Sequence, residues 1–193
     1  MTSETPSLYL PGSLQGHFLI SMPHMDDPNF AQAVIYICEH NASGAMGIII
    51  NRPLEIDLNE LLQHLDFSYH GDQIAPVYAG GPVQDDRGFI LHCRTANEWD
   101  SCYHITGELT LTTSMDILQA ISENRGPEQF LVALGYAGWG AGQLEQELSE
   151  NVWLSCLANL DIMFRTPAEE RLQAAATTLG VNLDLLTSQS GHA

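Results

Sequence analysis

The sequence predicts an α+β fold in a single domain. Short β-branched runs stand close together near the N-terminus, at residues 33–38 and 46–50, and the turn-forming Asn-Ala-Ser-Gly of residues 41–44 separates them. Helical spacing of apolar residues occurs in isolated segments and does not follow each strand, as it would in a doubly wound sheet. The length of 193 residues fits one domain, 1–193, in which about residues 1–12 form a polar lead-in.

Apolar runs bounded by turn residues predict the strands. The first two β-branched runs form a hairpin, and a run at residues 17–22 precedes them, followed by the turn-rich loop of residues 22–30. Residues 81–88 are predicted to be a turn. Further strands are predicted at residues 76–81, 88–93, 103–113, 130–137, 152–156 and 162–164.

Two amphipathic helices are predicted from caps and periodicity. Asp57 precedes leucines at helical spacing, and Glu60 stands three residues on as its capping-box partner. Thr113, with Asp116 three residues later, opens a second helix, which the Arg-Gly-Pro of residues 125–127 ends. A third short helix is expected after the glycine-rich segment, where leucines repeat four residues apart.

The last predicted helix has the clearest caps of the chain. Thr166 is its expected N-cap, Pro167 its first helical residue and Glu169 its capping-box partner. Gly180 is the expected stop. We therefore expect a helix over residues 167–179.

Charge is the most unusual property of the sequence. It has 24 acidic and 6 basic residues, which gives a formal net charge of −18. The basic residues are all arginines and are scattered: Arg52, Arg87, Arg94, Arg125, Arg165 and Arg171. Because affinity for nucleic acids comes largely from clustered cations that displace phosphate counterions, we do not expect direct nucleic-acid binding.

The composition also predicts the compartment. The N-terminus has neither a basic region nor a continuous apolar run, so we expect a cytosolic protein that does not enter a membrane. The four cysteines lie far apart and form no Cys-x-x-Cys pair. Reduced thiols, no cofactor and no metal site are therefore expected.

Three blocks carry a resemblance to a known family: residues 16–53, 79–92 and 134–154. The third, Leu-Gly-Tyr-Ala-Gly-Trp-Gly-Ala-Gly and onwards, is the most specific, because glycines interleaved with aromatic residues rarely arise by chance. The chain is identified on these blocks as a member of the AlgH (YqgE) family. The resemblance implies a branched, strongly coiled mixed sheet with a small barrel, surrounded by helices, and it implies no defined reaction. The family is often labelled a transcriptional regulator.

The glycine-rich segment admits two interpretations. Its glycines are Gly135, Gly138, Gly140 and Gly142. They could present backbone N–H groups to an anion at a helix N-terminus, although the glutamates that follow would repel a phosphate. Alternatively, they serve a tight turn with positive φ and close packing of strand and helix, which we favour.

An enzymatic alternative rests on Cys38 and His40. Residues two apart on a strand share a face, and a Cys–His pair can produce an activated thiolate. Such residues point side by side, however, and cysteine is commonly a buried core residue. His17, His24, His40 and His92 could converge on a metal ion, but their spacing supports no metal site.

The scarce arginines suggest a ligand site. Arg52, Arg87 and Arg94 each begin or follow a predicted strand, and together they could hold a carboxylate or phosphate. The alternative is that each pairs with a nearby acid such as Asp85 or Asp86. The proposed ligand-binding set is Asn51, Arg52, Gly80, Gly81, Arg87 and Arg94.

No coherent catalytic set emerges from these residues. We therefore expect a non-enzymatic regulatory or interaction module that binds a small anionic ligand or a protein partner and acts on transcription, if at all, indirectly. The alternatives are a direct transcriptional regulator, as the family label suggests, and an enzyme that uses His40 or Cys38.

Overall fold

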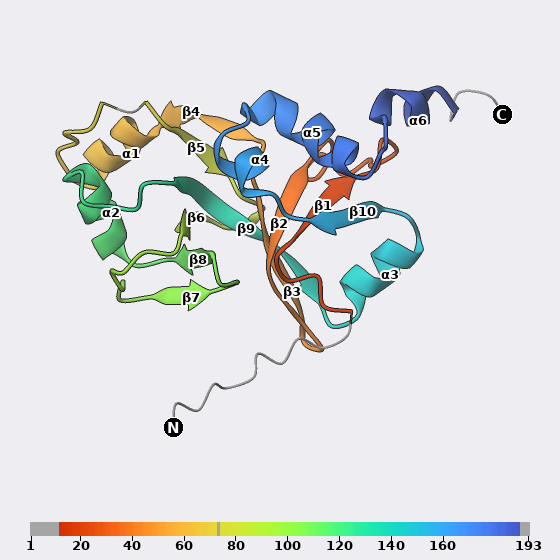
Figure 1. Ribbon diagram of the computed structural model, residues 1–193, viewed down its shortest axis with the longest axis horizontal. Coiled ribbons are helices and arrows are strands. Elements are labelled where there is room, and N and C mark those ends of the chain that lie inside the picture. Colours follow the sequence, from red (N-terminus) through yellow and green to blue (C-terminus); the bar gives the residue numbers. More distant parts are fainter. Residues whose placement is uncertain (1–11, 73, 190–193) are drawn as a thin grey trace.

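A computed structural model describes residues 12–72 and 74–189, and within them the chain forms one curled sheet with short helices around it (Figure 1). The strands are β1 (His17–Ser21), β2 (Val34–Asn41), β3 (Gly44–Ile49), β4 (Pro53–Asp57), β5 (Pro76–Ala79), β6 (Val83–Cys93), β7 (Cys102–His104), β8 (Leu109–Thr112), β9 (Phe130–Gly140) and β10 (Trp153–Leu157). The helices are α1 (Leu58–His64), α2 (Met115–Ser122), α3 (Gln143–Ser149), α4 (Leu160–Phe164), α5 (Arg171–Thr178) and α6 (Leu183–Gln189). The predicted α+β class is confirmed.

The sheet branches at its long central strand. Its main path runs β10-β1-β2-β3-β9-β6-β8-β7, and each of these pairs is antiparallel. Strand β5 pairs with β9 in parallel and with β4 in antiparallel orientation. Strand β9 therefore has three partners along its length, and the branched, coiled, mixed sheet that the family resemblance implies is confirmed.

Two glycines allow the chain to cross β9 closely where β5 leads into β6. Gly135 has φ +77°, and a Cβ atom there would lie 2.3 Å from the carbonyl oxygen of Gly81. Gly81 has φ +153°, and a Cβ atom there would lie 2.1 Å from the carbonyl carbon of Tyr136. Both contacts are with backbone, which cannot rotate away, so these positions require glycine.

Strands β1, β2 and β3 are buried on both faces along most of their length, except near the β2–β3 turn, where Glu39 and Asn41 are exposed. Phe18 and Tyr36 belong to one apolar cluster, whereas their neighbours Leu19 and Ile35 belong to a second on the opposite face. This double burial explains why these strands are continuous apolar runs without alternation. A third cluster, which includes Leu58, Leu62, Val77, Ile117 and Val132, lies beneath α1 and α2.

Four segments differ from their predicted structure. Residues 103–113 are not one strand but form β7 and β8, separated by residues 105–108. Residues 83–87 are not a turn but belong to β6, whose register against β9 shifts between Val83 and Gly88. Residues 138–140 continue β9, because they pair with β3. Residues 162–164 lie in α4, where the Asn159 side chain caps the helix and Ile162 and Met163 are buried. An apolar triplet this short does not distinguish strand from helix.

The helix caps were predicted in part. The Asp57–Glu60 capping box of α1 is confirmed. The N-cap of α2 is Ser114 and not Thr113, and Asp116 bonds to the Ser114 hydroxyl.

Near the C-terminus a 3₁₀ turn (Ala168–Glu170) precedes α5, so Thr166 does not cap that helix and its hydroxyl donates instead to the Asp161 carbonyl. Gly180, with φ +70°, follows the end of α5 as expected, whereas α6 was not predicted. The predicted lead-in lies outside the described residues except for Gly12.

Candidate functional site

The glycine–aromatic segment forms the second half of β9, beyond the crossing with Gly81. Tyr136 is half-buried and Gly138 is exposed, whereas Ala137 and Trp139 between them are buried in the second cluster. The segment therefore keeps the alternation of a strand, and Tyr136 and Trp139 lie on opposite faces of the sheet. It is not the turn that its glycine content suggests.

Residues 137–140 of β9 join β2 and β3 in a three-stranded extension of the sheet. The register aligns Glu39 with Met46 and Gly138, and Asn41 two residues on with Gly44 and Gly140. Alternate rows share a face. The residues of this outer face are Glu39, Asn41, Gly44, Met46, Gly138 and Gly140.

One edge of this extension is open. The pairing of β9 with β6 ends at Tyr136, and its pairing with β5 ends at Leu134. Among the described residues, residues 137–140 therefore pair with β3 on one side and with no strand on the other, where the Gln143 side chain already accepts the Gly140 N–H at 3.0 Å. A strand edge of this kind presents backbone groups that can pair with another chain.

A groove of about 600 Å³ lies beside this edge. We call it the β9 groove and define it by the lining residues Glu39, Met46, Arg87, Phe89, Tyr136 and Gly138. The rings of Phe89 and Tyr136 meet edge to face with centroids 5.4 Å apart, and the Arg87 guanidinium carbon lies 5.4 Å from the Phe89 centroid. The groove thus combines an aromatic wall, one cation and the exposed backbone of Gly138.

The fold does not require a glycine at position 138. A Cβ atom there would meet only the Tyr136 ring at 3.5 Å, which is an ordinary van der Waals contact, and its φ is not positive. A glycine within a strand weakens it, and such a glycine often marks a place where a ligand or another backbone approaches closely. Gly142 does have the role in a tight turn that we favoured for the glycines of this segment. It is the N-cap of α3 and has φ +74°.

Helix α3 is fixed to the sheet through a shared carboxylate. Oε2 of Glu147 accepts the indole N–H groups of Trp139 at 2.9 Å and of Trp153 at 2.8 Å. The two indole rings meet edge to face with centroids 6.1 Å apart. This arrangement explains why aromatic and acidic residues accompany the glycines.

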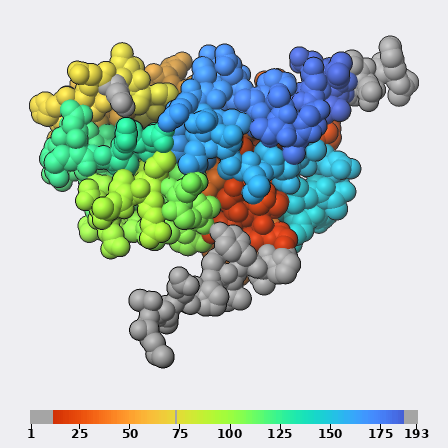
Figure 2. Space-filling view, viewed as in Figure 1, coloured from red at the N-terminus to blue at the C-terminus, as the bar shows by residue number. Residues whose placement is uncertain are grey.

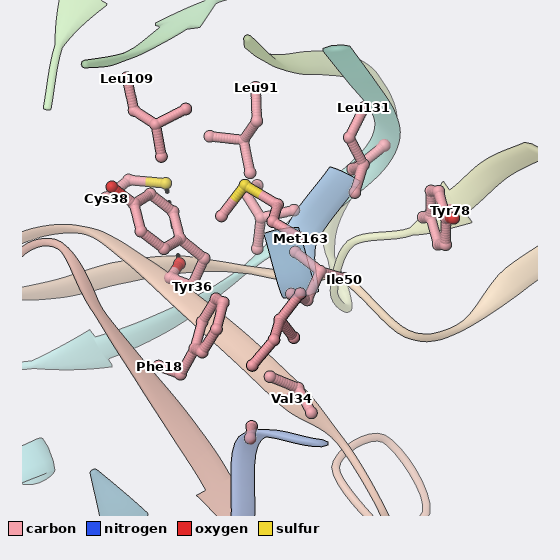
Figure 3. Close-up of a cluster of buried hydrophobic side chains, with 14 of the residues drawn as sticks. Phe18, Val34, Tyr36, Cys38, Ile50, Tyr78, Leu91, Leu109, Leu131 and Met163 are labelled. Atoms are coloured by element: carbon pink, nitrogen blue, oxygen red, sulfur yellow. Dashed lines mark hydrogen bonds between the residues drawn. The ribbon is translucent and has the colours of Figure 1, made fainter. Parts of the chain in front are cut away.

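The two catalytic candidates lie in different surroundings. Cys38 is fully buried in the first cluster with Tyr36 and Leu91 around it (Figure 3), and its thiol donates to the Tyr36 carbonyl oxygen at 3.8 Å. His40 contacts α3 instead: its Nε2 lies 2.7 Å from Oε1 of Glu145, and its Nδ1 accepts the backbone N–H of Leu14.

A β-bulge separates the two candidates. The register of β2 against β3 shifts between Ile37 and Glu39. The expectation that Cys38 and His40 share a face is therefore wrong, because the bulge interrupts the alternation on which it depended. Burial, and then the charge of Glu39, raise the pKa of the Cys38 thiol far above its usual range.

Cys38 should accordingly be unreactive in the native protein. We expect iodoacetamide at pH 8 to alkylate the half-buried Cys102 first, and to alkylate Cys38 at least roughly a hundredfold more slowly than in the unfolded chain, because reaction requires local opening and deprotonation. Mass spectrometry of time-resolved labelling measures both rates. Comparable rates for Cys38 in the native and the unfolded protein would restore the thiolate mechanism.

Asn51 and Arg52, both proposed as ligand residues, hold the loop of residues 22–32. The Arg52 guanidinium donates to the carbonyl oxygens of Asn29 at 2.5 Å and Ala31 at 2.8 Å. The Asn51 side chain bonds to the Val34 N–H and to the Gln32 carbonyl. These polar groups are thus engaged in positioning the loop.

The remaining proposed ligand residues lie apart. Gly80, like Gly81, packs against β9, where its Cβ would lie 2.3 Å from the Gly135 carbonyl oxygen. Arg87 lines the β9 groove and donates to the Gln84 side chain at 3.2 Å, and Arg94 is exposed, with its backbone bonded to Glu108. The ion pairs of the described residues do not include Arg52, Arg87 or Arg94, so the pairing alternative with Asp85 or Asp86 is not seen in these residues.

The histidines of residues 12–72 and 74–189 do not converge. His92 is buried, with Nε2 2.8 Å from the Thr112 hydroxyl, and burial lowers its pKa. In this part of the chain no three His, Cys, Asp or Glu side chains are arranged to hold a metal ion. Nor does any helix in it combine the length and apolar character needed to cross a membrane.

Two further features were missed by the sequence interpretation. The roles of Tyr136, Phe89 and Gly138 in a groove follow from the pairing of distant strands. Arg171, the last of the scarce bases, is 5% exposed and lines a separate pocket. The sequence signal that could have indicated its burial is the position of this arginine at the start of a helix with an apolar stripe.

Comparison with known proteins agrees with this architecture. The model of a family described as AlgH-like matches residues 18–184. The AlgH protein of Pseudomonas aeruginosa is 54% identical over 190 residues, which are 95% of this chain and 97% of that protein. A Nitrosococcus oceani relative, named only as a UPF0301 protein, is 52% identical over 181 residues, 93% of this chain and 96% of its own.

Solved structures extend the comparison to the fold. The solution structure of the Pseudomonas aeruginosa AlgH protein has 51% identity, covers 100% of both chains and superposes with a TM-score of 0.75. A crystal structure of a Corynebacterium diphtheriae protein shares the fold at 19% identity, with a TM-score of 0.71 over 90% of this chain and 91% of its own. The chain, with its branched sheet and glycine–aromatic β9, belongs to the AlgH-like family.

Proposed function

We propose that this protein is a cytosolic, non-enzymatic binding module whose β9 groove receives an extended segment of a protein partner. The observation that carries the proposal is the open edge of residues 137–140 beside that groove. An added strand gains main-chain hydrogen bonds along an open edge, while neighbouring pockets select its side chains. Gly138 leaves room for such a segment to approach the β9 backbone closely.

The charge of the molecule indicates the chemistry of the partner. A net charge of −18 attracts cationic proteins and accelerates their association at low salt. Within the groove, Glu39 suits a basic side chain of the partner, and the Phe89–Tyr136 pair suits an apolar one. Arg87 suits a carbonyl or carboxylate group. We therefore propose a partner with net positive charge.

The alternatives have less support. The burial of Cys38 and its separation from His40 argue against a thiolate enzyme. Direct DNA binding would need available cations, yet four of the six arginines pair with acids or with backbone carbonyls of the chain. Arg125 and Arg165 pair with acids, and Arg52 and Arg171 bond to backbone carbonyls. Any regulatory effect is therefore proposed to pass through the partner.

Affinity capture with chemical cross-linking tests this proposal, using Gly138→Val to fill the groove. The control is Gly107→Val, because Gly107 has open space around it and lies between β7 and β8. We expect the wild type and the control to retain a basic partner cross-linked near β9, and Gly138→Val to lose it at least roughly tenfold. Equal retention by all three proteins would contradict the proposal, as would capture of a small anion alone.

A further inference from the structure

Arg171 is a buried cation that the β9 groove does not use. It begins α5 and is 5% exposed. Its Nε donates to the Thr166 carbonyl oxygen at 2.9 Å, and one terminal nitrogen donates to the Ile50 carbonyl oxygen. Its guanidinium carbon lies 5.1 Å from the centre of the Tyr78 ring. The side chain is therefore held rigidly by two backbone oxygens and one aromatic face.

The charge of Arg171 has no acidic partner within the described residues. The ion pairs found there involve His40, Arg125 and Arg165 only. Burial of an ionised group is costly unless an opposite charge accompanies it, and carbonyl dipoles compensate that cost in part. An anion placed against this guanidinium would gain more from the pairing than one at the surface, because the surroundings are less polar than water.

Arg171 lines a pocket of about 390 Å³. We call it the Arg171 pocket and define it by Tyr78, Glu128, Phe130, Met163, Phe164 and Arg171. It forms where α4 and α5 meet the start of β9, along the seam between the blue and sea-green surfaces in Figure 2. Its volume lies within the range of small-molecule sites, and it shares no lining residue with the β9 groove.

We propose that the Arg171 pocket binds a small monocarboxylate with an apolar body. The N–H groups that remain after the two carbonyl contacts are on the terminal nitrogens, which can meet the two oxygens of a carboxylate end-on, and the carbonyl contacts already orient the guanidinium. Phe130, Met163 and Phe164 form the apolar wall for the rest of the ligand. The site combines a buried, oriented charge with apolar side chains in a pocket whose walls are partly polar, and this composition suits an organic acid.

Glu128 restricts the charge of the ligand. It is exposed at the same pocket, and its carboxylate would repel a second negative charge. The net charge of −18 acts in the same direction on polyanions. The pocket therefore discriminates against phosphate esters and dicarboxylates.

Titrations followed by amide NMR test this site with phenylacetate and its neutral analogue phenylacetamide. We expect saturable shifts at Leu131, Val132 and Phe164, and binding of phenylacetate at least about tenfold tighter than that of the amide, since a charged hydrogen-bonded pair is lost. Equal binding of the two compounds, no saturation by about 10 mM, or shifts confined to other surfaces would overturn the proposal.

Two variants test the roles of the Arg171 and Glu128 charges in ligand binding. The second replaces an exposed side chain, so its effect on binding does not depend on an effect on folding. Arg171→Lys retains the charge without the fork and should weaken phenylacetate at least about fivefold. Glu128→Gln changes an exposed side chain and should improve the binding of phenylphosphate severalfold relative to phenylacetate. Glu98→Gln, at an exposed residue that does not line the pocket, should not. An unchanged ratio in Glu128→Gln would contradict the proposed selectivity.

Discussion

Replacing Gly135 with alanine is expected to lower the free energy of unfolding by about 3–5 kcal/mol, because positive φ and overpacking each contribute about 1–3 kcal/mol. The added methyl group would lie 2.3 Å from the Gly81 carbonyl oxygen and 3.1 Å from that of Val83. Because both oxygens are backbone atoms, which cannot rotate away, relief requires the crossing of β9 to open.

Gly138→Ala is the matched control, since it adds the same methyl group to the same strand. Its only close contact is the Tyr136 ring, so we expect a change of less than about 1 kcal/mol, and in the stabilising direction. Urea denaturation followed by circular dichroism measures both variants. Similar losses in the two would mean that the glycines of β9 share one structural role, contrary to the distinction between crossing and groove.

Arg171→Met should lower the free energy of unfolding by about 2–4 kcal/mol. The thioether leaves the Thr166 and Ile50 carbonyls without their donors, and each buried orphan acceptor costs about 1–3 kcal/mol. The contact with the Tyr78 ring is also lost. Removal of a buried charge offsets part of this loss.

Arg165→Met is the control for this substitution, because Arg165 is exposed and pairs with Asp161 at 3.4 Å across one helical turn. Such pairs contribute about 0.3–0.5 kcal/mol. Thermal and urea unfolding of the two variants give the comparison. A loss below about 1 kcal/mol for Arg171→Met would show that the guanidinium is not a structural anchor.

The predicted elements that are confirmed depend on neighbours in sequence. The β2–β3 hairpin follows from two β-branched runs around a four-residue turn, and α1 follows from Asp57 and Glu60, three residues apart. In both cases the residues that specify the element, the hairpin turn and the capping box, lie within four positions of one another. Elements of this kind can therefore be predicted from the sequence alone.

The candidate site depends on contacts between distant segments. Residues 138–140 extend β9 because β3, about 90 residues earlier, pairs with them, and no local propensity favours a strand of glycines. The bulge that separates Cys38 from His40 likewise depends on register against β3. Arg87 was among the predicted ligand residues, but its aromatic neighbours could not be foreseen without the pairing of β6 and β9.

Hydrogen exchange of the captured complex tests the proposed partner site most directly. Peptides that cover residues 137–140 should exchange at least roughly tenfold more slowly in the complex than in the free protein, because an added strand protects the open edge. Peptides that cover β7 and β8 should be unchanged. Protection that falls elsewhere and leaves residues 137–140 unaltered would contradict the assignment of the β9 groove as the binding surface.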